Sequence, residues 1–163
     1  MSFEARLKRA HELEAGICQG LSEIGLWCAQ IGGEPMWTIP KTSTQTRAPD
    51  IVVFNRCLIE VKESLIYGGA GRLYSAQVRD YMRNWSHFPL PVFLFICAST
   101  GEYSGDVGAV SLSQLQSLRT SSECVDISLM DLFKVGRYRE SYVELNPLRI
   151  TSLFDKNPVQ VSK

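Results

Sequence analysis

The run VFLFICA at residues 92–98 is the feature that most constrains the fold of this chain. It is apolar throughout and shows no alternation between apolar and polar positions. A strand with one face in water does alternate, because successive side chains point to opposite faces of the sheet. Residues 92–98 therefore predict a strand that is covered on both faces, in a sheet with other layers packed on either side.

Two helical patterns supply those layers. From residue 3 to about residue 28, apolar side chains follow the spacing of one helix face, and Gly32 and Gly33 end that segment. A second stripe predicts a helix from about residue 73 to 87. Its members are Tyr74, Val78, Tyr81 and Trp85. Residues 111–119 predict a short helix with a serine cap.

The remaining strands complete an α/β pattern. Residues 51–54, 57–61 and 107–112 are short Val- and Ile-rich or apolar runs typical of strands, and residues 36–40 suggest another. This order predicts an α/β fold with a mixed central sheet flanked by helices. With 163 residues the chain suits one domain, with a core at about 3–119. The C-terminal extension, 120–163, reads as one or two strands and a loose tail.

Charge and cysteine usage restrict the class of protein. Basic and acidic residues number 17 each, so a nucleic-acid-binding surface would have to be a local patch. The five cysteines form no CxxC pair, which favours thiols in a reducing compartment over disulfides or a zinc site. The N-terminus has no apolar signal core and no run is long enough to span a membrane. We therefore expect a cytoplasmic protein with no membrane partner.

Three charges interrupt the apolar runs at 51–54 and 57–61. Asp50 precedes the first run, and Glu60 and Lys62 share one face of the second because residues two apart in a strand do so. Two carboxylates beside a lysine make a poor core but a suitable site for Mg²⁺ (or Mn²⁺), which binds through one or two carboxylates. The alternative is an ordinary ion pair or the solvent face of an amphipathic strand.

The register of this hairpin decides whether a site can form. Directly opposed residues of an antiparallel pair share a face, and a slip of one residue reverses it. A two-residue turn would direct Asp50 away from Glu60, whereas a three-residue loop at 54–56 would oppose the two. We therefore predict an odd-length loop, or a bulge near Asp50 with the same effect.

Glu14 is a charged residue close to the apolar stripe of the first helix, only about 35° from its centre at 100° per residue. A carboxylate on the buried side of a helix needs a partner. A metal ion or lysine at the hairpin would supply one, and a buried arginine or a backbone group is the alternative.

The second helix places Gln77 four residues before Tyr81, where it can hydrogen-bond a lysine or a nucleotide. Basic residues available for phosphate contacts surround the hairpin and this helix. They are Lys41, Arg47, Arg56, Arg72, Arg79 and Arg83.

Glu14, Pro49-Asp50, Glu60-Val61-Lys62 and Gln77-x-x-x-Tyr81 together resemble the motifs of the PD-(D/E)XK nuclease superfamily, over residues 3–112. The first motif is similar to that of archaeal Holliday-junction resolvases, IEVKES to the RecU resolvases, and the last to the QxxxY motif of RecB-type nuclease domains. The cysteines that bind an iron–sulfur cluster in some RecB-type domains are missing.

The resemblance implies a restriction-endonuclease-like core and a role for each matched residue. Asp50, Glu60 and the carbonyl of Val61 would hold Mg²⁺, and Lys62 would position the attacking water. Glu14 would complete the site and Gln77 would support it.

The implied function is a metal-dependent DNA endonuclease, acting as a homodimer or higher homo-oligomer on branched DNA in the manner of a junction resolvase. One alternative is a sequence-specific restriction or homing endonuclease that reads bases with the KTSTQTR loop at 41–47. A non-catalytic nucleic-acid-binding protein and an unrelated α/β binding module are further alternatives.

Overall fold

The computed structural model describes residues 3–31, 48–64, 70–99, 104–117, 124–128, 133–139 and 142–159. Its helices are α1 (Phe3–Glu23), α2 (Ser75–Trp85), α3 (Leu112–Ser117) and α4 (Pro147–Lys156). Its strands are β1 (Cys28–Gln30), β2 (Ile51–Val53), β3 (Cys57–Ser64), β4 (Ala70–Tyr74), β5 (Val92–Ala98), β6 (Asp106–Ser111), β7 (Cys124–Ser128), β8 (Phe133–Arg139) and β9 (Tyr142–Leu145). The predicted strand at 36–40 and the loop at 41–47 lie outside the described residues.

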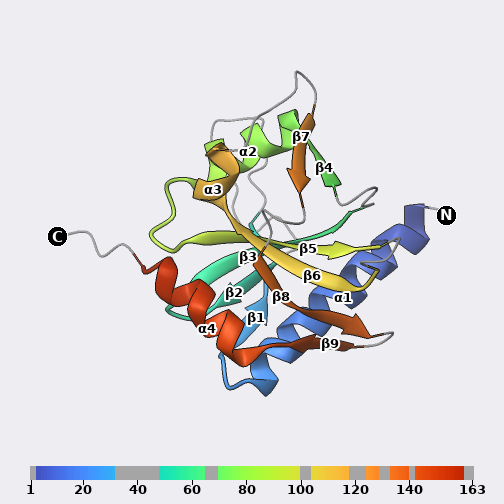
Figure 1. Ribbon diagram of the computed structural model, residues 1–163, viewed down its shortest axis with the longest axis vertical. Coiled ribbons are helices and arrows are strands. Elements are labelled where there is room, and N and C mark those ends of the chain that lie inside the picture. Colours follow the sequence, from blue (N-terminus) through green and yellow to red (C-terminus); the bar gives the residue numbers. More distant parts are fainter. Residues whose placement is uncertain are drawn as a thin grey trace.

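A seven-stranded sheet, in the order β1-β2-β3-β5-β6-β8-β9, forms the centre of the fold (Figure 1). β3 and β5 run parallel, and the other neighbouring strands of this sheet run antiparallel. A parallel pair needs a crossover connection, which β4 and α2 provide here. β4 pairs with β7 in a separate two-stranded sheet beside α2. The predicted fold class, a mixed sheet flanked by helices, is confirmed.

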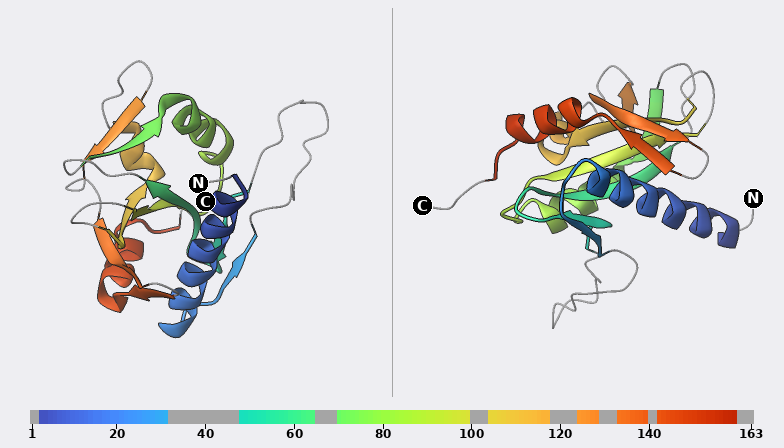
Figure 2. Two further views of the ribbon diagram at one scale, coloured as in Figure 1. Left: turned by 90° about the vertical axis from the view of Figure 1, so that its right-hand side faces the viewer. Right: turned by 90° about the horizontal axis from the view of Figure 1, so that it is seen from below.

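β5 is buried along its whole length, as the apolar run at 92–98 predicts. Phe93 and Phe95 contribute to a core shared with α1 and α4, whereas Leu94 and Ile96 contribute to a second core shared with α2 and α3. Figure 1 shows α2 and α3 in the upper part of the molecule and α1 and α4 in the lower part, and the left view of Figure 2 shows the same arrangement from the side. The sheet is therefore covered on both faces by helices, and its central strand has no solvent-facing side.

α1 ends earlier than the sequence pattern predicts, and that prediction is wrong. The N–H of Gly25 donates to the carbonyl of Ser22 at 3.0 Å, and the N–H of Leu26 donates to that of Leu21 at 3.0 Å. These two bonds form a Schellman motif around Gly25, which has a φ of 87°. Glycine adopts that conformation without steric cost, so the helix stops there and not at Gly32.

Two further segments differ from expectation. Residues 70–74 form β4 and do not begin α2, because they pair with β7. The C-terminal region includes α4, so the prediction of a loose tail is wrong for residues 147–156. Asn146 caps this helix by accepting a hydrogen bond from the N–H of Arg149 at 3.1 Å, and Pro147 occupies its first turn. The division of the chain into a core and an extension stays a prediction.

Candidate active site

The β2–β3 hairpin has the register that a shared site requires. Val53 opposes Cys57 and Ile51 opposes Ile59, so residues 54–56 form a three-residue loop. Asn55 in this loop has a φ of 59°, a conformation that asparagine tolerates better than most residues. Continued by one residue, the register places Asp50 opposite Glu60. The prediction of an odd-length loop is confirmed.

Glu60 is a buried carboxylate, with 6% of its surface exposed. The ammonium Nζ of Lys62 lies 2.5 Å from Oε1 of Glu60. The hydroxyl of Tyr81 donates to the same oxygen at 3.2 Å. This burial excludes the interpretation of Glu60 as a charge on the solvent face of the strand, although an ordinary ion pair with Lys62 is still compatible with it.

Asp50 lies where the pairing between β2 and β3 stops. Beyond Ile59, the next backbone N–H of β3 that points toward β2 is that of Val61. It donates to Oδ2 of Asp50 at 2.7 Å. The charge of Asp50 adds to the rise in the pKa of Glu60, so the two carboxyl groups interact. The hairpin therefore brings two carboxylates together where the pairing between β2 and β3 ends.

Two carboxyl groups at this site, those of Glu60 and Glu14, have raised pKa values. Burial raises the pKa of Glu60 to about 7, with Lys62 opposing the shift and Asp50 adding to it. Burial and then the charge of Asp50 also raise the pKa of Glu14 above its usual value. Carboxylates with raised pKa values in one place are typical of functional sites, because a bound cation would relieve their repulsion.

Glu14 points inward from α1, as its position near the apolar stripe predicts. Its side chain is 12% exposed, and its electrostatic neighbours include Asp50 and Lys62. The hydrogen-bonding partner is Nδ1 of His11, 3.3 Å from Oε2 of Glu14, rather than a buried arginine. α1 therefore brings a third carboxylate toward the hairpin from the other side of β3.

Tyr81 is the site residue that the sequence motif contained but to which the sequence assigned no role. Its ring stacks on Trp85 with centroids 4.5 Å apart, and Nζ of Lys62 lies 5.8 Å from its centroid. Burial raises the pKa of the Tyr81 hydroxyl, and the Gln77 side chain one helical turn earlier opposes that shift. The spacing of Gln77 and Tyr81 in the sequence thus places both residues beside Glu60.

The structure describes the side chains of three of the six predicted phosphate-binding residues. Arg56, Arg79 and Arg83 are exposed, and Nη2 of Arg83 pairs with Oδ1 of Asp80 at 2.9 Å. Arg72 belongs to β4, but its side chain lies outside the described part. Lys41 and Arg47 also lie outside the described residues.

The donor set fits a hard divalent cation with few protein ligands. Asp50 and Glu60 offer carboxylate oxygens side by side, which matches the way Mg²⁺ binds through one or two carboxylates and keeps water for its other positions. Within the described ranges, no group of three or more Asp, Glu, His or Cys side chains converges as a metal-ion site. A cation here would therefore be held by the pair and not by a protein cage.

Comparison with known proteins gives a structural likeness but no match to a protein family or a curated sequence. The backbone is similar to that of Hjc, a Holliday junction resolvase from the archaeal hyperthermophile Archaeoglobus fulgidus. The TM-score is 0.49 at 16% sequence identity, over 74% of this chain and 84% of the resolvase chain. A likeness at this level carries no information on activity or substrate.

A final finding concerns membranes. None of the helices in the described part of the chain has both the length and the apolar character needed to cross a bilayer.

Proposed function

We propose that this protein is a metal-dependent endonuclease that hydrolyses phosphodiester bonds in DNA. The observation that carries the proposal is the meeting of Asp50, Glu60 and Lys62 on β3 where its pairing with β2 ends: Asp50 binds the N–H of Val61, and Lys62 pairs with Glu60. A purely structural ion pair would need one carboxylate for the lysine. The second carboxylate, Asp50, accepts the N–H of Val61 but also repels Glu60, and a bound cation would relieve that repulsion.

Each residue of the site has a defined task in this proposal. Asp50 and Glu60 would hold the divalent cation, which when bound acts as a Lewis acid on the phosphodiester. The carbonyl of Val61 would assist, since a residue of an antiparallel ladder directs its N–H and C=O to the same side and the Val61 N–H already meets Asp50.

Lys62 would orient the attacking water and offset charge on the phosphate once the cation occupies Glu60. Tyr81 would hold the carboxylate of Glu60 in place through its hydroxyl, and Gln77 would support Tyr81. Glu14 would hold a proton or a water at the inner side of the site, where burial already favours its protonated form by raising its pKa.

The substrate we propose is branched DNA recognised by shape. The exposed cations near the site, Arg56, Arg79 and Arg83, can contact phosphates, which position a duplex but carry no base information. Selection of a four-way junction over linear duplex needs no reading of bases. A restriction or homing enzyme would instead need a base-reading element, for which the loop at 41–47 is the sequence candidate.

The proposal is tested by incubating the protein with Mg²⁺ or Mn²⁺ and labelled linear, single-stranded, flap and four-way-junction DNA. We expect the junction to be cut and an excess of linear duplex to compete poorly. Lys62→Ala should lower the cleavage rate by at least about 10²-fold, because the group that orients the water is lost. Asp50→Ala and Glu60→Ala should each abolish cleavage at any metal concentration tested.

The matched control is Lys8→Gln, which removes an exposed cation of α1 whose partner is Glu12, 3.8 Å away. It should cleave at the wild-type rate. A Lys62→Ala variant that cleaves as fast as wild type would show that the site is wrongly assigned. Cleavage restricted to one linear sequence would instead favour the restriction-type function.

A further inference from the structure

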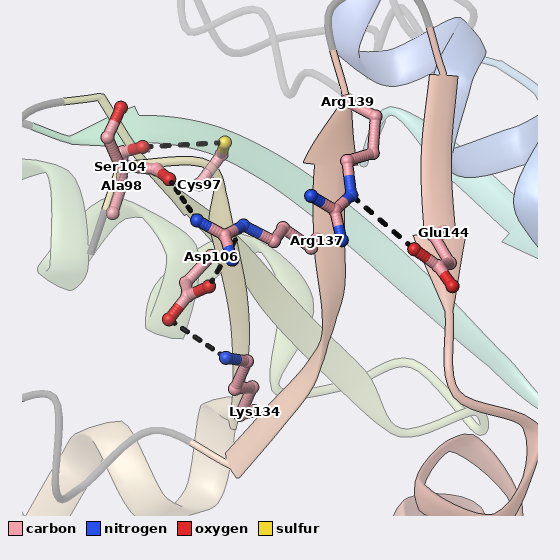
Figure 3. Close-up of polar contacts among 8 residues, drawn as sticks. All are labelled: Cys97, Ala98, Ser104, Asp106, Lys134, Arg137, Arg139 and Glu144. Atoms are coloured by element: carbon pink, nitrogen blue, oxygen red, sulfur yellow. Dashed lines mark hydrogen bonds and ion pairs between the residues drawn. The ribbon is translucent and has the colours of Figure 1, made fainter. Parts of the chain in front are cut away.

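A second group of basic residues lies on β8, outside the candidate active site. It consists of Lys134, Arg137 and Arg139, which we call the β8 basic row. Their side chains are 54%, 45% and 50% exposed. Figure 3 shows these three side chains with the carboxylates of Asp106 on β6 and Glu144 on β9.

An irregularity in the sheet aligns the row. Lys134 opposes Gly108 and Arg137 opposes Asp106, so a register shift at Val107 and Gly108 leaves one extra residue on β8. Gly108 and Asp106 share a face because they are two residues apart. Lys134 and Arg137 therefore share that face although they are three apart, and Arg139 follows on the same side. Without the shift, Lys134 and Arg137 would point to opposite faces.

The β8 basic row lies on the same face of the sheet as Glu60 and Lys62. Lys62 opposes Ile96, Ile96 opposes Gly108, and Gly108 opposes Lys134, so one transverse line of the sheet connects the two lysines. Three strand spacings of about 4.8 Å separate them by roughly 14 Å.

The β8 basic row also continues toward the end of the sheet at which β3 ends. β8 runs in the same direction as β3, because two antiparallel pairings separate β8 from β5, which is parallel to β3. Arg137 and Arg139 therefore extend toward the end of the sheet where β3 leaves the site.

The cations of the row are only loosely neutralised. Nζ of Lys134 lies 3.0 Å from Asp106, Nε of Arg137 lies 3.7 Å from the same carboxylate, and Nε of Arg139 lies 3.5 Å from Glu144. Three cations thus share two carboxylates. Exposed pairs of this kind are weak, and each guanidinium has five N–H donors, so most remain available to another anion.

We infer that the β8 basic row binds the phosphate backbone of the DNA whose scissile bond lies at Asp50 and Glu60, an inference that rests on the proposed function. A separation of roughly 14 Å corresponds to about four base-pair steps along the axis of B-form DNA, at 3.4 Å of rise per charge of one strand. The row therefore extends the contact to the arm of the substrate beyond the cleavage site. It contributes affinity and orientation and reads no bases.

The test measures binding of fluorescently labelled four-way junctions by anisotropy, in EDTA so that no cleavage occurs. Arg139→Gln should weaken binding about five-fold and reduce the dependence of log K on log salt by about 0.9, the value of one phosphate contact. Glu144→Gln should tighten binding about two-fold, because it removes the carboxylate that competes for Arg139. A merely structural role of the Arg139–Glu144 pair would not move the two variants in opposite directions.

Lys8→Gln removes one exposed cation with one carboxylate partner, and it should leave affinity unchanged. If wild type binds junctions and Arg139→Gln binds equally well, the inference is wrong whether or not the protein cleaves. If Lys8→Gln weakens binding as much as Arg139→Gln does, net charge alone explains the changes in affinity. The inference is then also wrong. Cleavage by wild type in Mg²⁺, measured separately, decides the proposed function, and wild type that binds no DNA overturns the inference.

Discussion

Glu60 accepts two donors and faces one repelling carboxylate. Lys62 and Tyr81 both contact its Oε1, while the charge of Asp50 repels it. Desolvation nevertheless dominates and raises its pKa from 4.5 to about 7. The folded protein therefore holds a proton that the unfolded chain releases between these two pH values, and folding stability falls as the pH rises through that window.

This shift predicts a stabilising substitution at the site. Glu60→Gln should raise the free energy of unfolding of the metal-free protein above pH 7 by roughly 1–3 kcal/mol, since each unit of pKa shift is worth about 1.4 kcal/mol. The gain should shrink below pH 7 and vanish below about pH 4.5, where Glu60 is protonated in both states. Urea unfolding at several pH values in EDTA measures it.

Glu12→Gln, at an exposed position of α1, is the control for the effect of removing a carboxylate and should change the unfolding free energy little. Addition of Mg²⁺ above pH 7 should stabilise wild type and not Glu60→Gln, because ligand binding to the folded state adds to its stability. An advantage of Glu60→Gln that is equally large at pH 4 and pH 8 would contradict the assigned environment of Glu60.

At the scale of elements, the packing of α1 on β9 fixes where Glu14 lies. α1 contacts β9 more extensively than β1 or β3, and Gly20 forms the closest approach. A Cβ at this position would lie 2.6 Å from the carbonyl oxygen of Val143. That distance is shorter than a carbon and a backbone oxygen can tolerate, so the helix would have to move away from the strand.

Gly20→Ala should therefore destabilise the protein by roughly 1–3 kcal/mol, as overpacking does. Helix propensity alone predicts the opposite sign, a gain of about 1 kcal/mol. Gly16→Ala is the matched comparison and should cost less, because the nearest atom to its Cβ would be in the side chain of Val143 at 3.1 Å, with backbone atoms no closer than 3.6 Å. A Gly20→Ala variant with a higher urea midpoint than wild type would show that α1 lies farther from β9.

At the scale of the whole molecule, charge and symmetry govern how the protein would handle DNA. The net charge is zero, so the proposed binding of DNA would depend on segregated cations such as the β8 basic row and not on a general positive field. One active site cuts one strand, whereas resolution of a junction requires two cuts. A symmetric homodimer is the simplest way for a chain with one such site to supply them.

We therefore expect a homodimer by light scattering at concentrations used for cleavage. A junction held in a supercoiled plasmid should yield linear product directly, because both cuts occur within one complex. A monomer across the measured concentration range, or accumulation of nicked plasmid alone, would contradict the resolvase-type function while leaving single-strand cleavage open.

Local patterns determined much of this protein. The apolar run at 92–98 predicted a strand covered on both faces, and β5 is buried throughout. The requirement that Asp50 and Glu60 share a face predicted the three-residue loop of the hairpin. These inferences succeed because side-chain direction along a strand or helix follows from backbone periodicity, which neighbouring residues fix.

The tertiary structure alone decided which distant segments meet. Tyr81 contacts Glu60 across the crossover between β3 and β5, and β8 joins the sheet that carries the site. The register shift opposite Val135 aligns Lys134 with Arg137, although their spacing along the chain separates them in a regular strand. Such contacts depend on packing between elements, which the residues of one segment cannot encode. The candidate site residues were therefore visible in the sequence, whereas the contact of Tyr81 with Glu60 and the alignment of the β8 basic row were not.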